Sequence, residues 1–240
     1  MVKEIIKLKK YEKQFKLEHP DYFPLDGITV FCGVQGSGKT LSAVRYVIDL
    51  AYKYPKCKIV SNLTINDTNL QDRIISWNGL ETLKLENGFE GIIYLLDEIH
   101  LEFNSLDSKQ IPTDVFIEIS QQRKQRKLIV GTSQLFLRMA KPFREQVKNV
   151  VFCEPCFFGC KIQNEWVRGC DLDELNGSIY ITQSKINRYY KSPEDFKLFD
   201  TYAKIRNYST MNRYNENLER SVKHGRINSY SNSVSHRVLL

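Results

Sequence analysis

The sequence lacks any long hydrophobic run. Its longest apolar stretches, at 92–96 and 128–130, have the length of strands, and none approaches the roughly 18–20 residues that a membrane-spanning helix needs. The N-terminal segment also lacks the uninterrupted apolar centre of a secretory signal, because lysines recur through it. We therefore expect a soluble, cytosolic protein with no transmembrane segment.

The composition is that of an ordinary globular protein. The 240 residues are enough for one α/β domain with additions, and 42% of them are hydrophobic and 26% charged. The net charge is +7 and the isoelectric point is near 9.0, which favours a polyanionic partner such as nucleic acid.

A complete phosphate-binding loop, G-x-x-x-x-G-K-[ST], occupies residues 33–40. It follows an apolar, β-branched run at 28–32 that predicts a buried strand. It precedes apolar residues at helical spacing from Leu41 to Tyr54. In that context a chance glycine-rich turn is the weaker interpretation. The predicted nucleotide-binding residues are Gly33, Val34, Gln35, Gly36, Ser37, Gly38, Lys39, Thr40 and Leu41.

The chemistry of this loop follows from its place between a strand and a helix. The turn through glycines directs a row of backbone N–H groups into one concavity, which binds the β-phosphate together with the positive end of the helix. Lys39 is expected to reach the β- and γ-phosphates, and the Thr40 hydroxyl is expected to bind Mg²⁺. The predicted cofactors are therefore ATP and Mg²⁺.

Two adjacent carboxylates, Asp97 and Glu98, end the buried strand predicted at 92–96. In an open α/β sheet, ligands bind at the carboxyl ends of the strands. Asp97 is therefore the candidate Walker B carboxylate that orders Mg²⁺ through water, and Glu98 is the candidate base that positions the attacking water. The alternative is that the two acids merely mark where the strand reaches solvent.

Polar residues also end a strand predicted at 128–134. Gln134 could hydrogen-bond the γ-phosphate or the attacking water there, or it could be a solvated strand end. Before this strand, an amphipathic helix opens at Pro112 and ends in basic residues. Arg123 and Arg126 in that basic end share a face at helical spacing. Either arginine could complete the site of a neighbouring subunit, and either could instead complement the helix dipole.

Alternating strand and helix patterns predict an α/β fold. Besides the elements above, the patterns predict strands at 57–61 and 150–152, a short helix at 69–77 and a helix at 135–147.

Six cysteines are present, and Cys32 and Cys57 lie in predicted strands, where buried thiols behave as small apolar residues. In a cytosolic protein, the spacing of the other four cysteines indicates metal binding rather than disulfide bonds as the first hypothesis to consider. Zinc sites usually pair two close C-x-x-C units, however, so plain thiols are the favoured interpretation and structural zinc is the alternative. These four are Cys153, Cys156, Cys160 and Cys170.

With these motifs in place, the chain resembles the zonula occludens toxin-like ATPases of filamentous phages, within the FtsK–HerA class of DNA pumps. The phosphate loop alone is unspecific, whereas the Asp-Glu-x-His element, the Gln-x-Arg helix end and the Ser-Gln strand tip together are more specific. The matching segments span roughly residues 28–152 and are GVQGSGKTLSAVRYVIDL, IVSNLTI, IIYLLDEIHLEF, the helix that ends in SQQRKQRK, and LIVGTSQ.

The resemblance implies an additional-strand, RecA-like P-loop NTPase fold with a mostly parallel central sheet in the order 5-1-4-3-2, flanked by helices. It also implies that Glu98 is catalytic, that Gln134 is a sensor, and that an arginine near Arg123 or Arg126 acts across the interface of a pentameric or hexameric homo-oligomeric ring. The implied activity is ATP-driven movement of viral DNA in the cytoplasm of the host cell.

One departure from the family bears on the partners. Its members usually carry a transmembrane helix after the ATPase domain, and this chain has none. This favours a soluble, DNA-translocating motor that packages the viral genome, with viral portal or assembly proteins as further partners. A phage assembly or extrusion ATPase of the zonula occludens toxin type stays open, as does a nucleotide-gated assembly switch that moves no DNA. A small-molecule kinase is disfavoured because no arginine-rich lid is visible.

Four segments are expected along the chain. Residues 1–26 are an N-terminal arm, for which a helix packed on the core is favoured over an arm that reaches a neighbouring subunit. Residues 27–152 are the P-loop ATPase core, and residues 153–202 are a β-rich extension packed on it. Residues 203–240 are a basic tail with seven Lys/Arg and two Glu, whose interleaved Tyr and Arg suit nucleic acid as well as plain solvation.

Overall fold

The computed structural model describes residues 2–104, 113–175 and 178–200, and the statements below concern these ranges. The strands are β1 Gly27–Cys32, β2 Lys58–Ser61, β3 Ile74–Ser76, β4 Ile92–Leu96, β5 Lys127–Ser133, β6 Val147–Cys156, β7 Lys161–Arg168, β8 Leu172–Leu175, β9 Ser178–Ile181 and β10 Lys185–Tyr190. The α-helices are α1 Val2–Glu18, α2 Lys39–Lys53, α3 Thr113–Ser120, α4 Gln122–Gln125 and α5 Lys141–Arg144. The 3₁₀-helices are η1 Gln71–Arg73, η2 Leu80–Lys84, η3 Gly88–Glu90, η4 Ile99–Leu101, η6 Phe136–Arg138, η7 Gly169–Asp171 and η8 Asp195–Lys197.

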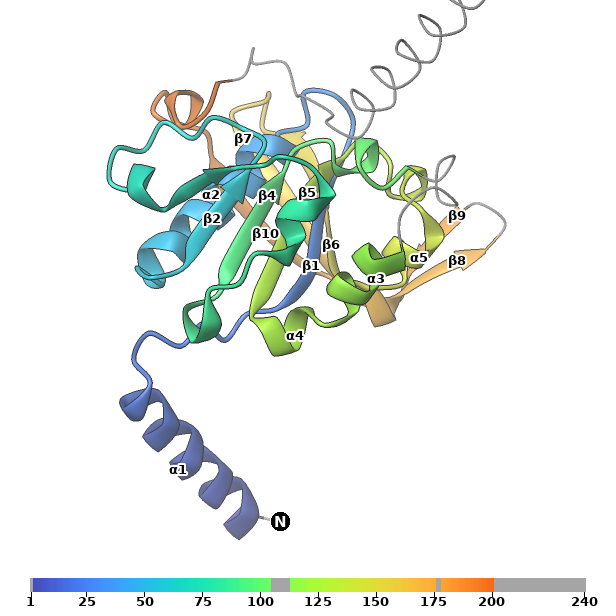
Figure 1. Cartoon of the computed structure of the whole chain (residues 1–240). Coiled ribbons are helices and arrows are strands. Elements are labelled where there is room, and N and C mark those ends of the chain that lie inside the picture. Colours follow the sequence, from blue (N-terminus) through green and yellow to red (C-terminus); the bar gives the residue numbers. More distant parts are fainter. Residues whose placement is uncertain (1, 105–112, 176–177, 201–240) are drawn as a thin grey trace, which may run out of the picture. The chain divides into compact units, whose positions relative to one another are not determined.

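Eight strands form one sheet in the order β10-β7-β6-β1-β5-β4-β2-β3 (Figure 1). The strands from β6 to β3 are parallel, and β7 runs antiparallel to both of its neighbours, β6 and β10. The predicted α/β class is confirmed, and the five strands expected from the sequence follow the order 5-1-4-3-2 as β6-β1-β5-β4-β2. The sheet differs in detail, because β3 continues it beyond β2 and because β7 and β10 continue it beyond β6.

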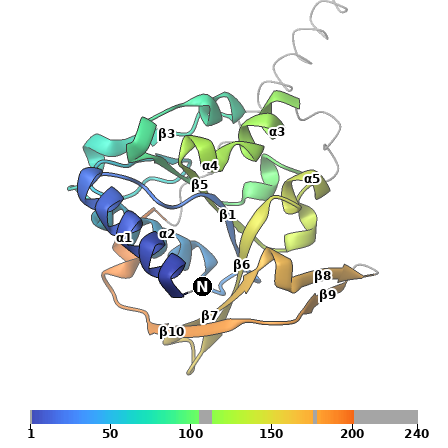
Figure 2. The ribbon, with the colours of Figure 1, turned by 90° about the horizontal axis from the view of Figure 1, so that it is seen from below.

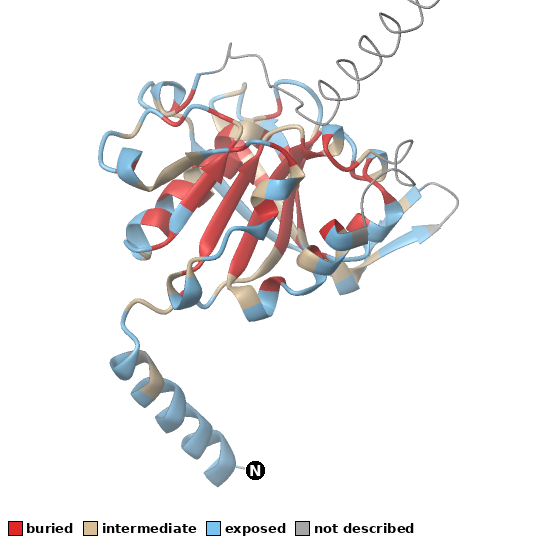
Figure 3. Cartoon of the chain, viewed as in Figure 1, coloured by how far each residue is buried: buried red, intermediate tan, exposed pale blue. Residues whose placement is uncertain are grey.

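The central strands are buried on both faces. Every residue of β4 and β5 is buried, as expected of parallel strands covered on both sides (Figure 3). The apolar residues of α2 recur at helical spacing, and this face packs on β1, β4, β5 and β6. On the opposite face, the stacked rings of Phe103 and Phe143 lie 4.2 Å apart. The core therefore fixes the carboxyl ends of the central strands, where the phosphate loop lies.

The segment after residue 152 is part of the same sheet. β6 runs through the expected boundary between 152 and 153 and ends at Cys156, and β7 and β10 then extend the sheet outward (Figure 2). β8 and β9 form a separate antiparallel hairpin. The β-rich character of this segment was predicted, but its place in the main sheet was not.

Side chains from β7, β10 and the segment after it fasten this outer part of the sheet to α2. The Ser42 hydroxyl donates to Asn164 Oδ1 at 3.0 Å and lies 2.8 Å from the Tyr189 hydroxyl. One helical turn further on, Arg45 donates to Asp195 Oδ2 at 3.0 Å. The helix that follows the phosphate loop is thus held by the central strands and by the outer strands.

Three helix predictions from the sequence were wrong in part. The segment 69–77 forms η1 and then β3. The segment 135–147 forms η6 and α5 and then enters β6. Its buried residues Phe136, Met139 and Phe143 have helical spacing, but two separate short turns bury them. The helix predicted through residue 127 breaks at Gln121 into α3 and α4, and residues 105–112, which include its predicted start, lie outside the described ranges.

The first helix was predicted to pack on the core, and this was wrong. α1 forms, but its apolar side chains remain exposed, including Ile5 at 50%, Leu8 at 62% and Tyr11 at 67% (Figure 3). Phe15 in its last turn stacks with Tyr11 and meets the ring of Tyr22 edge to face. Within the described ranges, no helix is both long and apolar enough to cross a bilayer. The predicted basic tail, 203–240, lies outside these ranges.

Candidate nucleotide-binding site

The phosphate loop joins the carboxyl end of β1 to the first turn of α2. Gly36 and Gly38 have φ values of +78° and +91°, a left-handed conformation that L side chains rarely adopt. The first backbone amides of α2 have no acceptor within the helix, so they point out of its N-terminal end. Ser37 Oγ is buried and has no hydrogen-bond partner among the described residues. This is the geometry of an anion site.

The first turn of α2 meets the β4 tip through a hydroxyl and a carboxylate. Thr40 Oγ1 donates to Asp97 Oδ1 at 2.9 Å, and Asp97 Oδ1 also accepts from Thr132 Oγ1 at 2.5 Å. Hydroxyl and carboxylate oxygens are the ligands that Mg²⁺ prefers, and Mg²⁺ keeps several waters when few protein oxygens are offered. The residues present therefore fit the predicted Mg²⁺ site, in which Thr40 would bind the ion directly and Asp97 would order it through water.

Asn62, the residue after β2, clamps the backbone of Asp97. Its side-chain oxygen accepts from the Asp97 N–H at 2.8 Å, and its amide group donates to the Asp97 carbonyl at 3.0 Å. Neither Asn62 nor Thr132 was predicted from the sequence to have a role at the site. The available signal was their position, since each lies at the carboxyl end of a strand that neighbours β4 in the predicted order.

Glu98 turns sharply away from β4. Its φ of 49° and ψ of 48° are left-handed, and its backbone N–H donates to Thr132 Oγ1 at 2.9 Å. The carboxylate lies between the side chains of Lys39 and His100. Oε1 is 3.7 Å from Lys39 Nζ, and Oε2 is 3.3 Å from His100 Nδ1. Oε2 is buried and accepts no hydrogen bond from the described residues. Glu98 is therefore held beside the phosphate-loop lysine, and its Oε2 can accept a hydrogen bond from a further group.

His100 is largely buried beside this carboxylate. Burial lowers the pKa of His100, and the charges of Arg138 and Lys39 lower it further, while the Glu98 charge opposes them. The imidazole is therefore neutral near pH 7, and Nδ1 also lies 3.4 Å from Ser133 Oγ. A neutral ring beside Glu98 offers one donor at most, which leaves the charge of Glu98 facing Lys39.

Gln134 follows β5 at the same edge of the sheet. It is half-buried and lines a largely apolar cavity of about 520 Å³ together with Gly33, Val34 and Phe152. The register of β1 and β5 pairs Cys32 with Ser133, so Gln134 lies beside the start of the phosphate loop. Its predicted contact with a γ-phosphate stays a prediction.

Arg123 in α4 and Arg126 just after it precede β5, so they lie at the opposite edge of the sheet from the phosphate loop, where Figure 1 shows α4. They do not share a helix face, because α4 ends at Gln125 and Arg126 has a left-handed φ of 54°. Arg126 is half-buried and lies over the Tyr22 ring at 4.4 Å from its centroid, whereas Arg123 is exposed. The seven residues of β5, at about 3.3 Å each, separate both arginines by roughly 20 Å from the phosphate loop of the same chain.

The four clustered cysteines do not come together. Cys153 is buried and burial raises its pKa to about 12, whereas Cys160 and Cys170 are exposed. In the ranges that the structure describes, no three His, Cys, Asp or Glu side chains are placed to hold a metal ion. Cys32 and Cys57 are buried, as predicted.

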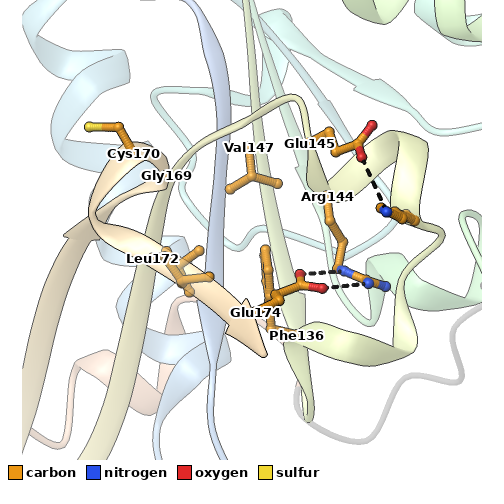
Figure 4. A pocket seen from close by; sticks show the side chains of 10 residues that line it. Phe136, Arg144, Glu145, Val147, Gly169, Cys170, Leu172 and Glu174 are labelled. Carbon is orange, nitrogen blue, oxygen red and sulfur yellow. Dashed lines mark hydrogen bonds and ion pairs between the residues drawn. The ribbon is translucent and has the colours of Figure 1, made fainter. Parts of the chain in front are cut away.

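A second cavity of about 520 Å³ lies away from the phosphate loop, between α5 and the β8 strand (Figure 4). Arg144 and Glu174 point toward each other across it and form a bidentate ion pair, with both nitrogen–oxygen distances 2.9 Å. Arg144 also donates to the carbonyls of Leu137 and Met139. The two charges thus satisfy one another and fasten the β8–β9 hairpin to α5.

The fold and this site define a P-loop NTPase. No protein-family model matches the chain, and no curated protein matches it. Among solved structures, it is similar to the N-terminal domain of zonular occludens toxin from Neisseria meningitidis, with a TM-score of 0.52 and 14% identity over 72% of this chain and 98% of that one. The fold is thus that of the zonula occludens toxin-like P-loop ATPases, as the motifs predicted.

Two further solved structures are similar. The genome packaging NTPase B204 from Sulfolobus turreted icosahedral virus 2, in complex with AMPPCP, has a TM-score of 0.44 and 9% identity over 66% of this chain and 97% of that one. The flagellar accessory protein FlaH from Methanocaldococcus jannaschii has a TM-score of 0.43 and 13% identity over 69% of this chain and 89% of that one.

Proposed function

We propose that this protein is an ATP-hydrolysing motor that translocates or packages phage DNA as a homo-oligomeric ring. The observation that carries ATP hydrolysis is the convergence of four side chains at one edge of the sheet. Thr40 Oγ1 lies 2.9 Å from the Asp97 carboxylate, and Lys39 Nζ lies 3.7 Å from the Glu98 carboxylate, next to the first-turn amides of α2. A cation, an ion-binding pair and a base are thus assembled where phosphates would bind.

The roles follow from these positions. Lys39 and the amides of the loop, with that of Leu41, bind the phosphates; the Leu41 side chain itself is buried in the core. Thr40, and Asp97 through water, would hold Mg²⁺, which would supply positive charge beside the phosphates. Glu98 accepts a hydrogen bond from the attacking water and Gln134 orients the γ-phosphate or that water, so positioning and electrostatics lower the barrier.

Arg123 is the arginine that we assign to the neighbouring subunit's site. The roughly 20 Å between it and its own phosphate loop prevents action within one chain, and its exposed side chain is free to enter another. Arg126 is the weaker candidate because its guanidinium is engaged with Tyr22. Such a finger contributes on the order of 10³–10⁵ in rate, so hydrolysis would require the ring.

The DNA part of the proposal is supported by charge and by the resemblance in sequence. The net charge of +7 suits a polyanion, and the matching motifs are those of DNA pumps. Viral portal or assembly proteins would be further partners in the host cytoplasm.

The experiment is the ATPase rate per subunit against protein concentration, with and without double-stranded DNA, at low salt. We expect the rate to climb with concentration and to climb again with DNA. A rate that depends neither on protein concentration nor on DNA would exclude the motor hypothesis and leave a nucleotide-gated assembly switch. If the protein did not bind ATP at all, both hypotheses would be excluded.

A further inference from the structure

Thr132 in β5 contacts both acids at the β4 tip. Its Oγ1 donates to Asp97 Oδ1 at 2.5 Å and accepts from the Glu98 backbone N–H at 2.9 Å. The residue is 0% exposed. The two strands last pair at Leu96 and Gly131, so this hydroxyl takes over at the point where the backbone ladder between them ends.

The number of protons sets the direction of these bonds. A hydroxyl has one proton and two lone pairs, and a backbone N–H can only donate. Thr132 therefore accepts from Glu98, and its single proton is left for Asp97. Asp97 Oδ1 then receives protons from two hydroxyls, those of Thr132 and Thr40, an arrangement that suits a carboxylate.

The same hydroxyl holds an unfavourable turn. A left-handed conformation is unfavourable for a residue with a Cβ atom, and Glu98 adopts it with φ at 49°. The Glu98 N–H is bound by Thr132, and the preceding N–H, that of Asp97, is bound by Asn62. These two bonds fix the direction in which the Glu98 side chain leaves the strand, toward Lys39 and His100.

We propose that Thr132 is a positioning residue that sets the orientation of the Asp97 carboxylate and the turn at Glu98 together. It thereby ties the strand that carries Gln134 to the strand that carries both acids. This inference rests on the proposed ATPase function and acts through Asp97 and Glu98. Loss of the hydroxyl would free Asp97 to rotate away from the Mg²⁺ position and would leave the Glu98 N–H without its acceptor.

The test compares Thr132→Val, which removes the hydroxyl, with Thr132→Ser, which keeps it. Thr29→Val is the matched control, since Thr29 is also buried, at 1% exposed, but lies in β1 and contacts Asn149 instead of the acids. The first readout is the Mg²⁺ concentration that half-maximally tightens binding of a fluorescent ATP analogue, and the second is kcat and KM. Should Thr132→Val not fold, Thr132→Ala is measured in the same way.

We expect Thr132→Val to raise the half-saturating Mg²⁺ concentration and to lower kcat, each by about tenfold or more, as loss of supporting groups around a metal site does. Thr132→Ser should keep both values within about twofold of those of the wild type. Thr29→Val should have the same half-saturating Mg²⁺ concentration and kcat as the wild type. If Thr132→Val lowered the melting temperature but left the half-saturating Mg²⁺ concentration unchanged, Thr132 would have a merely structural role. That result would overturn the proposal. So would a Thr132→Ser variant as impaired as Thr132→Val.

The two proposals fail separately. If the wild type hydrolyses ATP but never responds to DNA or to concentration, the motor is lost. The Mg²⁺ titration then still decides the role of Thr132, because it measures nucleotide binding without turnover.

Discussion

Gly38, the residue before the phosphate-loop lysine, lies directly against Ile162 of β7. A Cβ atom placed on Gly38 would lie 2.2 Å from Ile162 Cδ1, well inside van der Waals contact. The outer part of the sheet therefore limits the shape of the phosphate loop, although the motif itself spans only residues 33–40.

We expect Gly38→Ala to lower the free energy of unfolding by about 2–4 kcal/mol, because it combines a left-handed φ with overpacking against Ile162. Gly36→Ala is the control. It has a similar φ but open space around its Cβ position, so its cost should be about 1 kcal/mol. Urea denaturation measures both. Adding Ile162→Ala should reduce the cost of Gly38→Ala, and equal costs in both backgrounds would show that the contact does not matter.

Asn62→Ala should lower the free energy of unfolding by about 1–3 kcal/mol, because the N–H and carbonyl of Asp97 both lose their partner in a half-buried place. It should also slow ATP turnover by loosening Asp97. The control is Asn66→Ala, whose side chain donates one exposed hydrogen bond to the Lys197 carbonyl. Chemical denaturation and the ATPase rate are the two measurements, and equal effects of the two variants would contradict the clamp.

Glu98→Gln should bind ATP within a few-fold of the wild type but lower kcat by at least about 10², because the amide keeps the shape and loses the base. Binding is measured with a fluorescent ATP analogue and turnover by phosphate release. Glu145→Gln is the control, since Glu145 is exposed and pairs only with Lys141 among the described residues. An active Glu98→Gln variant would remove Glu98 from the mechanism.

Arg123→Ala should be nearly inactive alone and should regain activity when mixed with Glu98→Gln subunits. In a mixed ring, an Arg123→Ala subunit keeps its own Glu98 and receives Arg123 from a Glu98→Gln neighbour. Arg126→Ala should keep its activity and lose about 1 kcal/mol of stability, because it ends the stacking on Tyr22. The measurement is the rate of phosphate release from Arg123→Ala and Glu98→Gln subunits mixed in varied ratios. If the mixtures release phosphate no faster than the two variants do separately, action between subunits is excluded.

Stability should fall as the pH is lowered below about 6.5. The lowered pKa of His100 means that the unfolded chain binds a proton in a pH range where the folded chain does not, so protonation favours unfolding. The loss should begin near the unfolded pKa of about 6.5 and continue until the pH passes the lower, folded pKa. Urea midpoints from pH 7.5 to 5 measure it. His100→Asn should flatten this slope, and a slope that His100→Asn leaves unchanged would contradict the role given to His100.

The phosphate loop and the two acids could be predicted because each motif is local, and the parallel sheet then brings the strand ends together. The roles of Asn62 and Thr132 could not, because they depend on the register by which β2 and β5 flank β4. The spacing of Phe136, Met139 and Phe143 is compatible with one helix and equally with two short turns. Periodicity alone therefore predicted the wrong structure for that segment.

The helix break at Gln121 and the left-handed Arg126 also had no sequence signal, since neither position is glycine or proline. As a result, the predicted shared face of Arg123 and Arg126 was wrong, and the role of either arginine in a neighbouring subunit's site stays a prediction. The place of β7 and β10 in the main sheet could not be foreseen either, because pairing between strands distant in sequence leaves no local pattern.

The two outer strands bear on how the protein behaves at high concentration. An uncovered strand edge invites pairing with another chain, and proteins blunt such edges by shortness or by charge. At one side of the sheet, β3 has only three residues. At the other, β10 is exposed along most of its length but carries Lys185 and Arg188. Within the described ranges, both outer strands therefore carry features that disfavour self-association by strand addition.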